Sequence, residues 1–249
     1  MYKVARIKII PNNIGNEDFD DLTVDFLSML YKNGQILSEY IVENHETYYL
    51  ATVTTTDDDS LDSKYFNKYI HMVLEKIDYS VEMVSDDALS EESCKCKEHD
   101  FYFLAPVYSE ESSPVYCGNC GKEIPLIHLP YINNDEEHFW VLSFQREFKA
   151  VDTLWMDSLS DRFTRRQLLK HDSQLSKAAL GICRDLEEKV KKPVLYLMPP
   201  KYMFSLLFKK DETIDVCPKC GKQLEMVDTE QAIDKVCWDC RLGFKEASK

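Results

Sequence analysis

The sequence lacks several features that would assign it to a familiar class of protein. No apolar run approaches the roughly 18–20 residues that a membrane span needs. The N-terminus leads into the polar run "NNIGNEDFDD", whereas a secretory signal needs a longer apolar core and a small-residue cleavage site. The chain also contains no glycine-rich phosphate loop, no nucleophile elbow and no His-Glu-x-x-His motif. We therefore expect a cytoplasmic protein that is not an enzyme.

Positive charge is scarce as well. The 249 residues include 30 Lys and Arg against 44 Asp and Glu, a net charge of −14. Residues 1–90 carry −10 and residues 91–160 carry −8, while residues 161–210 reverse the sign to +7. An acidic protein repels phosphate backbones at long range and attracts basic partners. A hydrophobic content of 44% with 12% aromatic residues is typical of a folded chain.

Residues 1–88 alternate between strand and helix patterns. Strands are predicted at "KVARIKII", where Ala5, Ile7 and Ile9 share one face, and at "QILSEYIV", "TYYLATVTTT" and "VEMVS". Apolar residues at helical spacing predict two helices, the first beginning after Asn16 as N-cap and ending at Asn33-Gly34. The helical positions are Phe19, Leu22, Phe26, Met29 and Leu30, then Phe66, Ile70, Val73 and Ile77. The order βαββαβ predicts an α+β protein that begins with a ferredoxin-like domain.

The polar, acidic run "SDDALSEESCKCKEHD" predicts a domain boundary near residue 88. Residues 89–249 are then expected to form a second domain in which a helical segment is flanked by two zinc-ribbon modules. Its parts are a first ribbon at 94–130, a helical insert at 136–190, a strand at "PVLYLM" and a second ribbon at 212–245. An earlier acidic run, Asp57–Asp59, is interpreted as the cap of the second helix of the first domain, exposed to solvent.

Eight of the nine cysteines fall into close pairs, a pattern that indicates metal ligation in a reducing compartment. The clearest pattern is "DVCPKCGKQ" followed by "KVCWDCRLG", with 16 residues between the pairs. Two residues between cysteines allow a tight knuckle to direct both sulfurs at one ion, and Gly221 suits the turn that follows. The predicted ligands are Cys217, Cys220, Cys237 and Cys240. Four thiolates close the coordination shell, so the predicted zinc is structural.

The first module is less regular. "CGNCGK" at residues 117–122 is a knuckle, but its partner is Cys94-Lys-Cys96, followed three residues later by His99. The preferred ligands of a second structural zinc are Cys94, Cys96, Cys117 and Cys120, and a set in which His99 replaces Cys94 stays open. The remaining cysteine, Cys183, is expected to be a small buried hydrophobic residue.

Four motifs in fixed order carry a resemblance to a known family: "SPVYCGNCGKEIPLIHLP", "HFWVLSFQREFKAVDTLWM", "SQLSKAALGICRDLEEKVKKPVLYL" and "CPKCGKQLEM…KVCWDCRLG". From residue 94 onward the chain resembles a bacterial family of unknown function, described as zinc-ribbon-containing and nucleic-acid-binding. The resemblance implies ribbon cysteines at 117, 120, 217, 220, 237 and 240 with a helical insert between the ribbons. It implies no established activity.

Two kinds of partner remain open. The charge distribution favours a binding protein that recognises a basic protein, for instance an immunity or antitoxin-like protein that blocks a toxin by mimicking phosphate charge. The alternative is nucleic-acid binding by the basic segment, with Tyr196, Tyr202 and Phe204 available for stacking. The basic residues proposed for that role are Arg162, Arg165, Arg166, Lys170, Lys177 and Arg184. Neither a membrane nor a small-molecule substrate is indicated.

Overall fold

A computed structural model describes residues 2–12, 19–105, 113–134, 136–200, 214–227 and 233–246. The chain divides into two compact units: unit 1 comprises residues 1–93 and 125–139, and unit 2 comprises residues 94–124 and 140–249. This division differs from a single boundary near residue 88 because residues 125–139 return to unit 1. None of the helices in the described ranges is both long and apolar enough to cross a bilayer.

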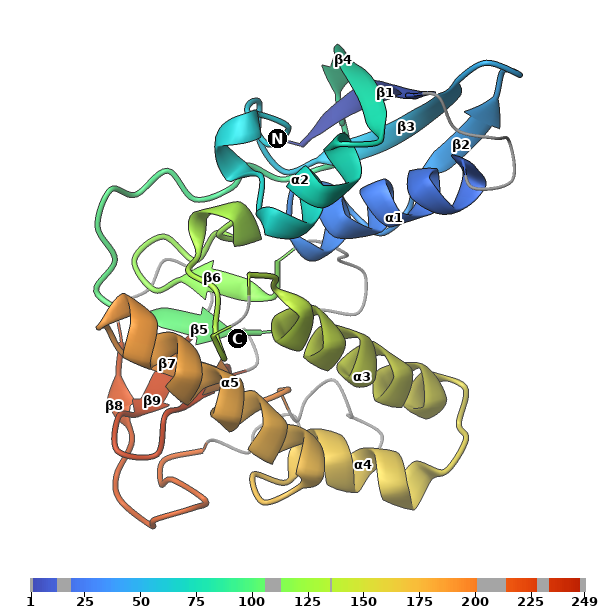
Figure 1. The fold of residues 1–249 in the computed structure, drawn as a ribbon. Helices are drawn as coiled ribbons and strands as arrows, with labels where there is room; N and C mark the ends of the chain where they lie inside the picture. Colours follow the sequence, from blue (N-terminus) through green and yellow to red (C-terminus); the bar gives the residue numbers. More distant parts are fainter. Residues whose placement is uncertain are drawn as a thin grey trace. The chain divides into compact units, whose positions relative to one another are not determined.

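Unit 1 contains a four-stranded antiparallel sheet with two helices on one face (Figure 1). The strand order across the sheet is β2-β3-β1-β4, so β2 and β4 are its edges. Its elements in chain order are β1 (Lys3–Pro11), α1 (Phe19–Lys32), β2 (Ile41–Asn44), β3 (Tyr49–Thr55), α2 (Lys68–Leu74) and β4 (Ile77–Asp86).

The core of unit 1 lies between this sheet and its helices. Ala5, Ile7 and Ile9 of β1 are fully buried, which confirms the alternation predicted for this strand. From α1, Phe26 and Leu27 are also fully buried, and they belong to the same apolar cluster. Burying each side chain of this size contributes about 1.5–3 kcal/mol. The alternating apolar pattern therefore determines which face of the sheet the helices cover.

Two elements of unit 1 are shorter than their patterns predict. The helix predicted from Phe66 to Ile77 is α2, which spans only Lys68–Leu74 because Asn67 caps it and Ile77 begins β4. The strand predicted at residues 35–42 begins only at Ile41, and Ile36 forms an isolated bridge to Thr55. The proposed N-cap Asn16 lies outside the described residues.

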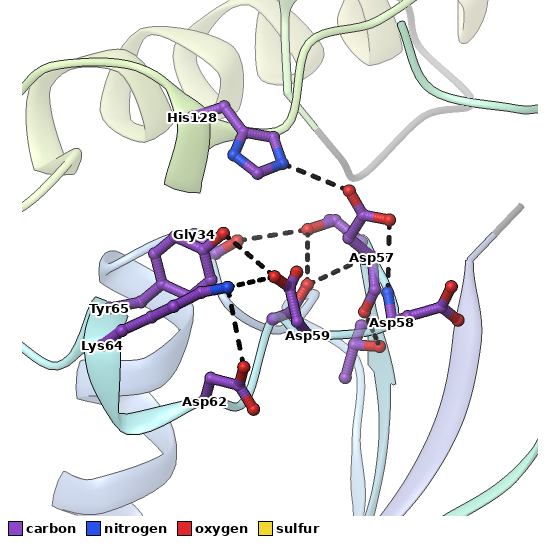
Figure 2. Close-up of polar contacts among 11 residues, drawn as sticks. Gly34, Asp57, Asp58, Asp59, Asp62, Lys64, Tyr65 and His128 are labelled. Atoms are coloured by element: carbon purple, nitrogen blue, oxygen red, sulfur yellow. Dashed lines mark hydrogen bonds and ion pairs between the residues drawn. The ribbon is translucent and has the colours of Figure 1, made fainter. Parts of the chain in front are cut away.

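The acidic run Asp57–Asp59 does not cap α2, contrary to the sequence interpretation. The Asn67 side chain has that role, since it accepts a hydrogen bond of 3.0 Å from the Ile70 N–H. Figure 2 shows the acidic side chains in pairs: Asp59 contacts Lys64, and Asp57 Oδ2 lies 3.2 Å from His128 Nε2. The run thus joins a surface loop to the segment that returns from later in the chain.

The returning segment, residues 125–139, is bound to unit 1 by a buried polar network. The Tyr131 hydroxyl donates to Asn33 Oδ1 at 2.5 Å, and Asn67 Nδ2 donates to the Glu136 carbonyl at 2.6 Å. His138 is buried, which lowers its pKa to about 3 and keeps the ring neutral. At Gly34, with φ of +79°, an added Cβ would lie 2.5 Å from Leu126 Cβ. Glycine is therefore required at position 34, where the turn after α1 packs against residues 125–139.

Unit 2 contains one six-stranded sheet with the order β6-β5-β7-β10-β9-β8. Its helices are α3 (Phe139–Met156), α4 (Asp161–Leu169) and α5 (Gln174–Val190), and Ser173 caps α5 by accepting a hydrogen bond from the Ser176 N–H. Cys183 is fully buried in α5. The strands are β5 (Tyr102–Leu104), β6 (Val115–Cys117), β7 (Val194–Leu197), β8 (Glu225–Met226), β9 (Lys235–Cys237) and β10 (Leu242–Phe244).

Candidate metal centres

The structure brings together the four cysteines that the sequence prefers for the first module. We call Cys94, Cys96, Cys117 and Cys120 the first cysteine group; their sulfurs all lie within 4.8 Å of one another. Cys117 ends β6, and Cys94 and Cys96 come from a loop segment outside any strand. The Cys94 N–H donates to the Glu123 carbonyl at 2.7 Å, which fixes this segment beside the knuckle.

The knuckle of the first cysteine group is held by its own backbone. The Cys117 N–H donates to the Lys122 carbonyl at 2.9 Å, and the Gly121 N–H donates to the Cys117 carbonyl at 2.9 Å. Gly121 has φ of +69°, a region that favours glycine. The Asn119 N–H points at Cys117 Sγ at 3.4 Å, so the turn also supplies a donor that stabilises a thiolate.

His99 lies beside the first cysteine group. Its Nδ1 is 3.1 Å from Cys117 Sγ, and its ring packs on Tyr102 with centroids 4.9 Å apart. Burial lowers the pKa of His99, which favours the neutral ring. The four donor atoms that gather are those of the cysteines, Cys94 included, and His99 is the neighbour of one of them.

The second cysteine group consists of Cys217, Cys220, Cys237 and Cys240, again with all sulfurs within 4.8 Å. Its first knuckle repeats the bonds of the first group: the Cys217 N–H donates to the Lys222 carbonyl at 2.8 Å, and Gly221 has φ of +73°. Its other half is a second knuckle that follows β9, where Arg241 has φ of +57°. An ion pair between Lys222 and Asp239 joins the two knuckles.

The protonation of these thiols is linked to their surroundings. Burial raises the pKa of Cys94 and of Cys240, whereas the Lys222 backbone lowers the pKa of Cys220 to about 7. Burial also opposes ionisation of Cys120, but hydrogen bonding from the Lys122 backbone and neighbouring thiols lowers its pKa. Four adjacent thiols cannot all ionise without a cation, because like charges repel. A divalent ion removes that repulsion and deprotonates its ligands.

Each group therefore has a donor set that fits a structural metal ion. Four soft sulfur ligands in a compact cluster are typical of zinc, and they leave no coordination position for water or a substrate. Three of the four cysteines of the second group are buried, and only Cys220 is exposed. The two groups accordingly indicate two structural metal sites.

The two cysteine groups share one sheet. Strand β7 pairs in parallel with β5, next to the first group, and in parallel with β10, next to the second. Glu187 of α5 adds a side-chain link: its carboxylate accepts two bonds of 2.7 Å from Arg241 and a third of 3.1 Å from the Val194 N–H. The sequence pattern of α5 carries no signal for this link, which joins residues far apart along the chain.

The basic residues proposed for nucleic-acid binding lie on or beside α4 and α5. Arg165 pairs with Asp161 at 2.6 Å, and Arg184 pairs with Asp185 at 3.1 Å. In the described part of the chain, the other four form no ion pair and are exposed: Arg162, Arg166, Lys170 and Lys177. Tyr196 is fully buried in β7, so it is not available for stacking, and Tyr202 and Phe204 lie outside the described residues. Phe163, 50% exposed on α4, is an aromatic residue close in sequence to these basic side chains, and no stacking role was expected for it from the sequence.

Comparison with known proteins yields two matches to family models. Residues 96–199 match a domain of unknown function (DUF2310), and residues 9–85 match a second domain of unknown function (DUF8589). Searches of the curated proteins and of the solved structures returned no match. The first match and the two cysteine groups fit a zinc-ribbon-like family of unknown function. Nucleic-acid binding and a bacterial origin, which the resemblance implied, stay predictions.

Proposed function

We propose that this protein is a non-enzymatic binding protein in which two zinc ions hold unit 2 in shape for the recognition of a macromolecular partner. The observation that carries the proposal is the pair of four-cysteine groups joined through β7 in one sheet. A closed four-thiolate shell stabilises a fold and offers no site for turnover. The zinc ions thus act as scaffold.

Magnitudes support a scaffold role. A structural zinc contributes on the order of 10–16 kcal/mol of apparent binding free energy in small peptides, and whole domains are stable by about 5–15 kcal/mol. The β-strands of unit 2 have two to four residues each. Because such short strands form few hydrogen bonds with their neighbours, we infer that the metals decide whether the sheet forms.

For unit 1 we infer a ferredoxin-like arrangement. Support comes from the element order βαββαβ, from the strand order β2-β3-β1-β4 and from antiparallel pairing throughout the sheet. This fold hosts many functions, so the inference concerns architecture alone.

The partner we favour is a basic protein, in the manner of an immunity or antitoxin-like protein that blocks a toxin. The support is the net charge of −10 over residues 1–90. Several acidic side chains there are exposed and form no ion pair within the described residues, among them Asp25, Glu75, Asp78 and Glu82. Such a surface speeds association with a basic protein and mimics phosphate charge.

Nucleic-acid binding is the second candidate. It is favoured by the four exposed basic side chains on or beside α4 and α5 that have no ion-pair partner in the described part of the chain, together with the exposed ring of Phe163. The test is a mobility shift at several salt concentrations with the double variant Arg162→Glu and Arg166→Glu. A salt-dependent shift that the variant loses supports this candidate, and the absence of a shift at low salt rules it out.

The proposed function is tested in two steps on the full chain purified under reducing conditions. Elemental analysis is expected to give two zinc ions per chain, and a strong chelator is expected to unfold unit 2, as followed by circular dichroism and limited proteolysis. Cross-linking in the cells that express the protein, followed by reconstitution from purified components, is expected to identify a basic protein. Metal-free protein with an undisturbed fold would refute the scaffold role, and a partner without net positive charge would refute the charge argument.

A further inference from the structure

Strand β4 forms one edge of the sheet in unit 1 over an unusual length. It spans ten residues, Ile77–Asp86, and pairs with β1 from Ile77 to Asp86. A register shift near Val4 interrupts the ladder only toward its end, so the part from Ile77 to Met83 is regular. No described strand pairs with the other side of β4. In an antiparallel edge strand, alternate backbone N–H and C=O groups point outward and are free to pair with a further strand.

The regular part of β4, Ile77–Met83, lacks the basic residues and prolines that often protect edge strands; its charged residues are the acidic Asp78 and Glu82, and the register shift lies near the far end of the strand. The whole strand, IDYSVEMVSD, contains no Lys, Arg, Pro or Gly. The opposite edge, β2, has only four residues, a length that offers few backbone bonds. The exposed fractions of Val81 and Met83 are 38% and 46%. The edge formed by β4 is therefore open to pairing with a further strand, and it carries exposed apolar side chains.

The two faces of β4 differ in chemistry. Val81 and Met83 are opposite Ile7 and Ala5 in register, so they lie on the face that the helices cover and extend the apolar core outward. Asp78, Ser80 and Glu82 lie on the other face. Arg6 is opposite Glu82 on β1, yet neither Glu82 nor Asp78 forms an ion pair within the described residues. Asp86, at the end of the strand, pairs with Lys3 at 2.6 Å.

An edge strand can pair with a second copy of the same chain or with a segment of another protein, and the charges on β4 distinguish these two partners. A second copy of the chain, paired through β4, would place one row of acidic side chains beside another, which is unfavourable. A segment with basic side chains would instead form ion pairs with Asp78 and Glu82. We propose that β4 binds an extended, basic segment of another protein by strand addition, with basic side chains toward Asp78 and Glu82 and apolar side chains toward Val81 and Met83. The inference rests on the proposed protein-binding function and names the surface and the form of the partner.

The test uses a phage-displayed library of random ten-residue peptides panned on the full zinc-loaded chain. We expect enriched peptides in which Lys or Arg alternates with Val, Ile, Tyr or Phe. Glu82→Lys is expected to weaken binding of a representative synthetic peptide by about tenfold or more, because a charge reversal at the contact costs at least one factor of ten. The matched control Glu43→Lys makes the same charge change on exposed β2 and is expected to bind like the wild type.

Hydrogen exchange supplies a second readout, because strand addition protects backbone amides. The peptide is expected to slow exchange in the fragment that covers residues 77–86 and to leave the fragment that covers residues 41–44 unchanged. Basic peptides that bind Glu82→Lys and Glu43→Lys equally well would overturn the edge site while leaving an acidic binding surface in place. Enrichment of acidic or helix-patterned peptides, or of none, would overturn the strand-addition site and the preference for a basic partner, while the scaffold role of the metals would still be decided by metal analysis. Concentration-dependent dimerisation that Glu82→Lys changes would assign β4 to a second copy of the chain.

Discussion

The two cysteine groups contain the same knuckle but complete it in different ways. In both, the first cysteine N–H bonds to the carbonyl five residues later, and a glycine with positive φ follows the second cysteine. The second group adds another knuckle, whose Arg241 is bound to Glu187 of α5. The first group adds the Cys94–Cys96 loop segment and the nearby ring of His99. One half of each site is local and repeated, while the other half depends on the rest of the unit.

The largest effect is expected from removal of a ligand. Cys237 ends β9, which pairs with β10 and β8, so Cys237→Ser leaves the second metal with three ligands beside these strands; we expect loss of one metal ion per chain and unfolding of much of unit 2. Cys94→Ser is expected to lose the other ion with less unfolding, because Cys94 lies outside the strands. Metal content by mass spectrometry and circular dichroism measure both outcomes. Cys183→Ala, at a buried cysteine outside both groups, should retain two metal ions; full metal content in Cys237→Ser would contradict the assignment.

A smaller effect is expected where α5 meets the second group. Glu187→Gln removes the carboxylate charge that Arg241 and the Val194 N–H share, and we expect a loss of about 1–2 kcal/mol because the pair is partly exposed. Urea unfolding of the zinc-loaded chain measures it. Glu188→Gln, at the exposed neighbouring position, is the matched control and should change stability by less than about 0.5 kcal/mol.

The same ion pair predicts a pH dependence. Arg241 holds the pKa of Glu187 below its ordinary value. A carboxyl group with a lower pKa in the folded state stabilises that state above its unfolded pKa of about 4.3, and the contribution is lost as the pH falls through the lowered value. The stability difference between the wild type and Glu187→Gln should therefore shrink as the medium is acidified below pH of about 4. A difference that grows on acidification would contradict this origin.

The contrast between the groups also shows where sequence reasoning succeeds. The knuckles at residues 117–122 and 217–222 follow from local spacing, since each needs only a short turn and a glycine. The strand alternation of Ala5, Ile7 and Ile9 is local too. The link between the groups through β7 and the return of residues 125–139 to unit 1 are not local. They depend on β7 lying between β5 and β10 and on Tyr131 reaching Asn33, contacts between distant residues that leave no periodic pattern.

A further prediction concerns the ring that distinguishes the first group. His99→Phe keeps a ring near Tyr102 but removes the nitrogen beside Cys117 Sγ, so we expect the first group to release its metal about tenfold faster to a chelator. His99→Asn places an amide donor near the position of Nδ1 and should release it at close to the wild-type rate. The second group provides the internal control, because its release phase should not change. Equal acceleration of both phases would indicate a general loss of stability.

The smallest effect is expected at the knuckle glycine, a feature that both cysteine groups share. Gly221 has φ of +73° and open space around an added Cβ, so the cost of Gly221→Ala is that of the backbone alone, about 1 kcal/mol. Gly181 of α5 also has open space but lies inside a helix, and Gly181→Ala should stabilise the chain by about 0.5–1 kcal/mol. The same added methyl group is thus expected to lower the free energy of unfolding at position 221 and to raise it at position 181. Urea unfolding of the two variants measures both, and a stabilising Gly221→Ala would show that the knuckle does not need the left-handed turn.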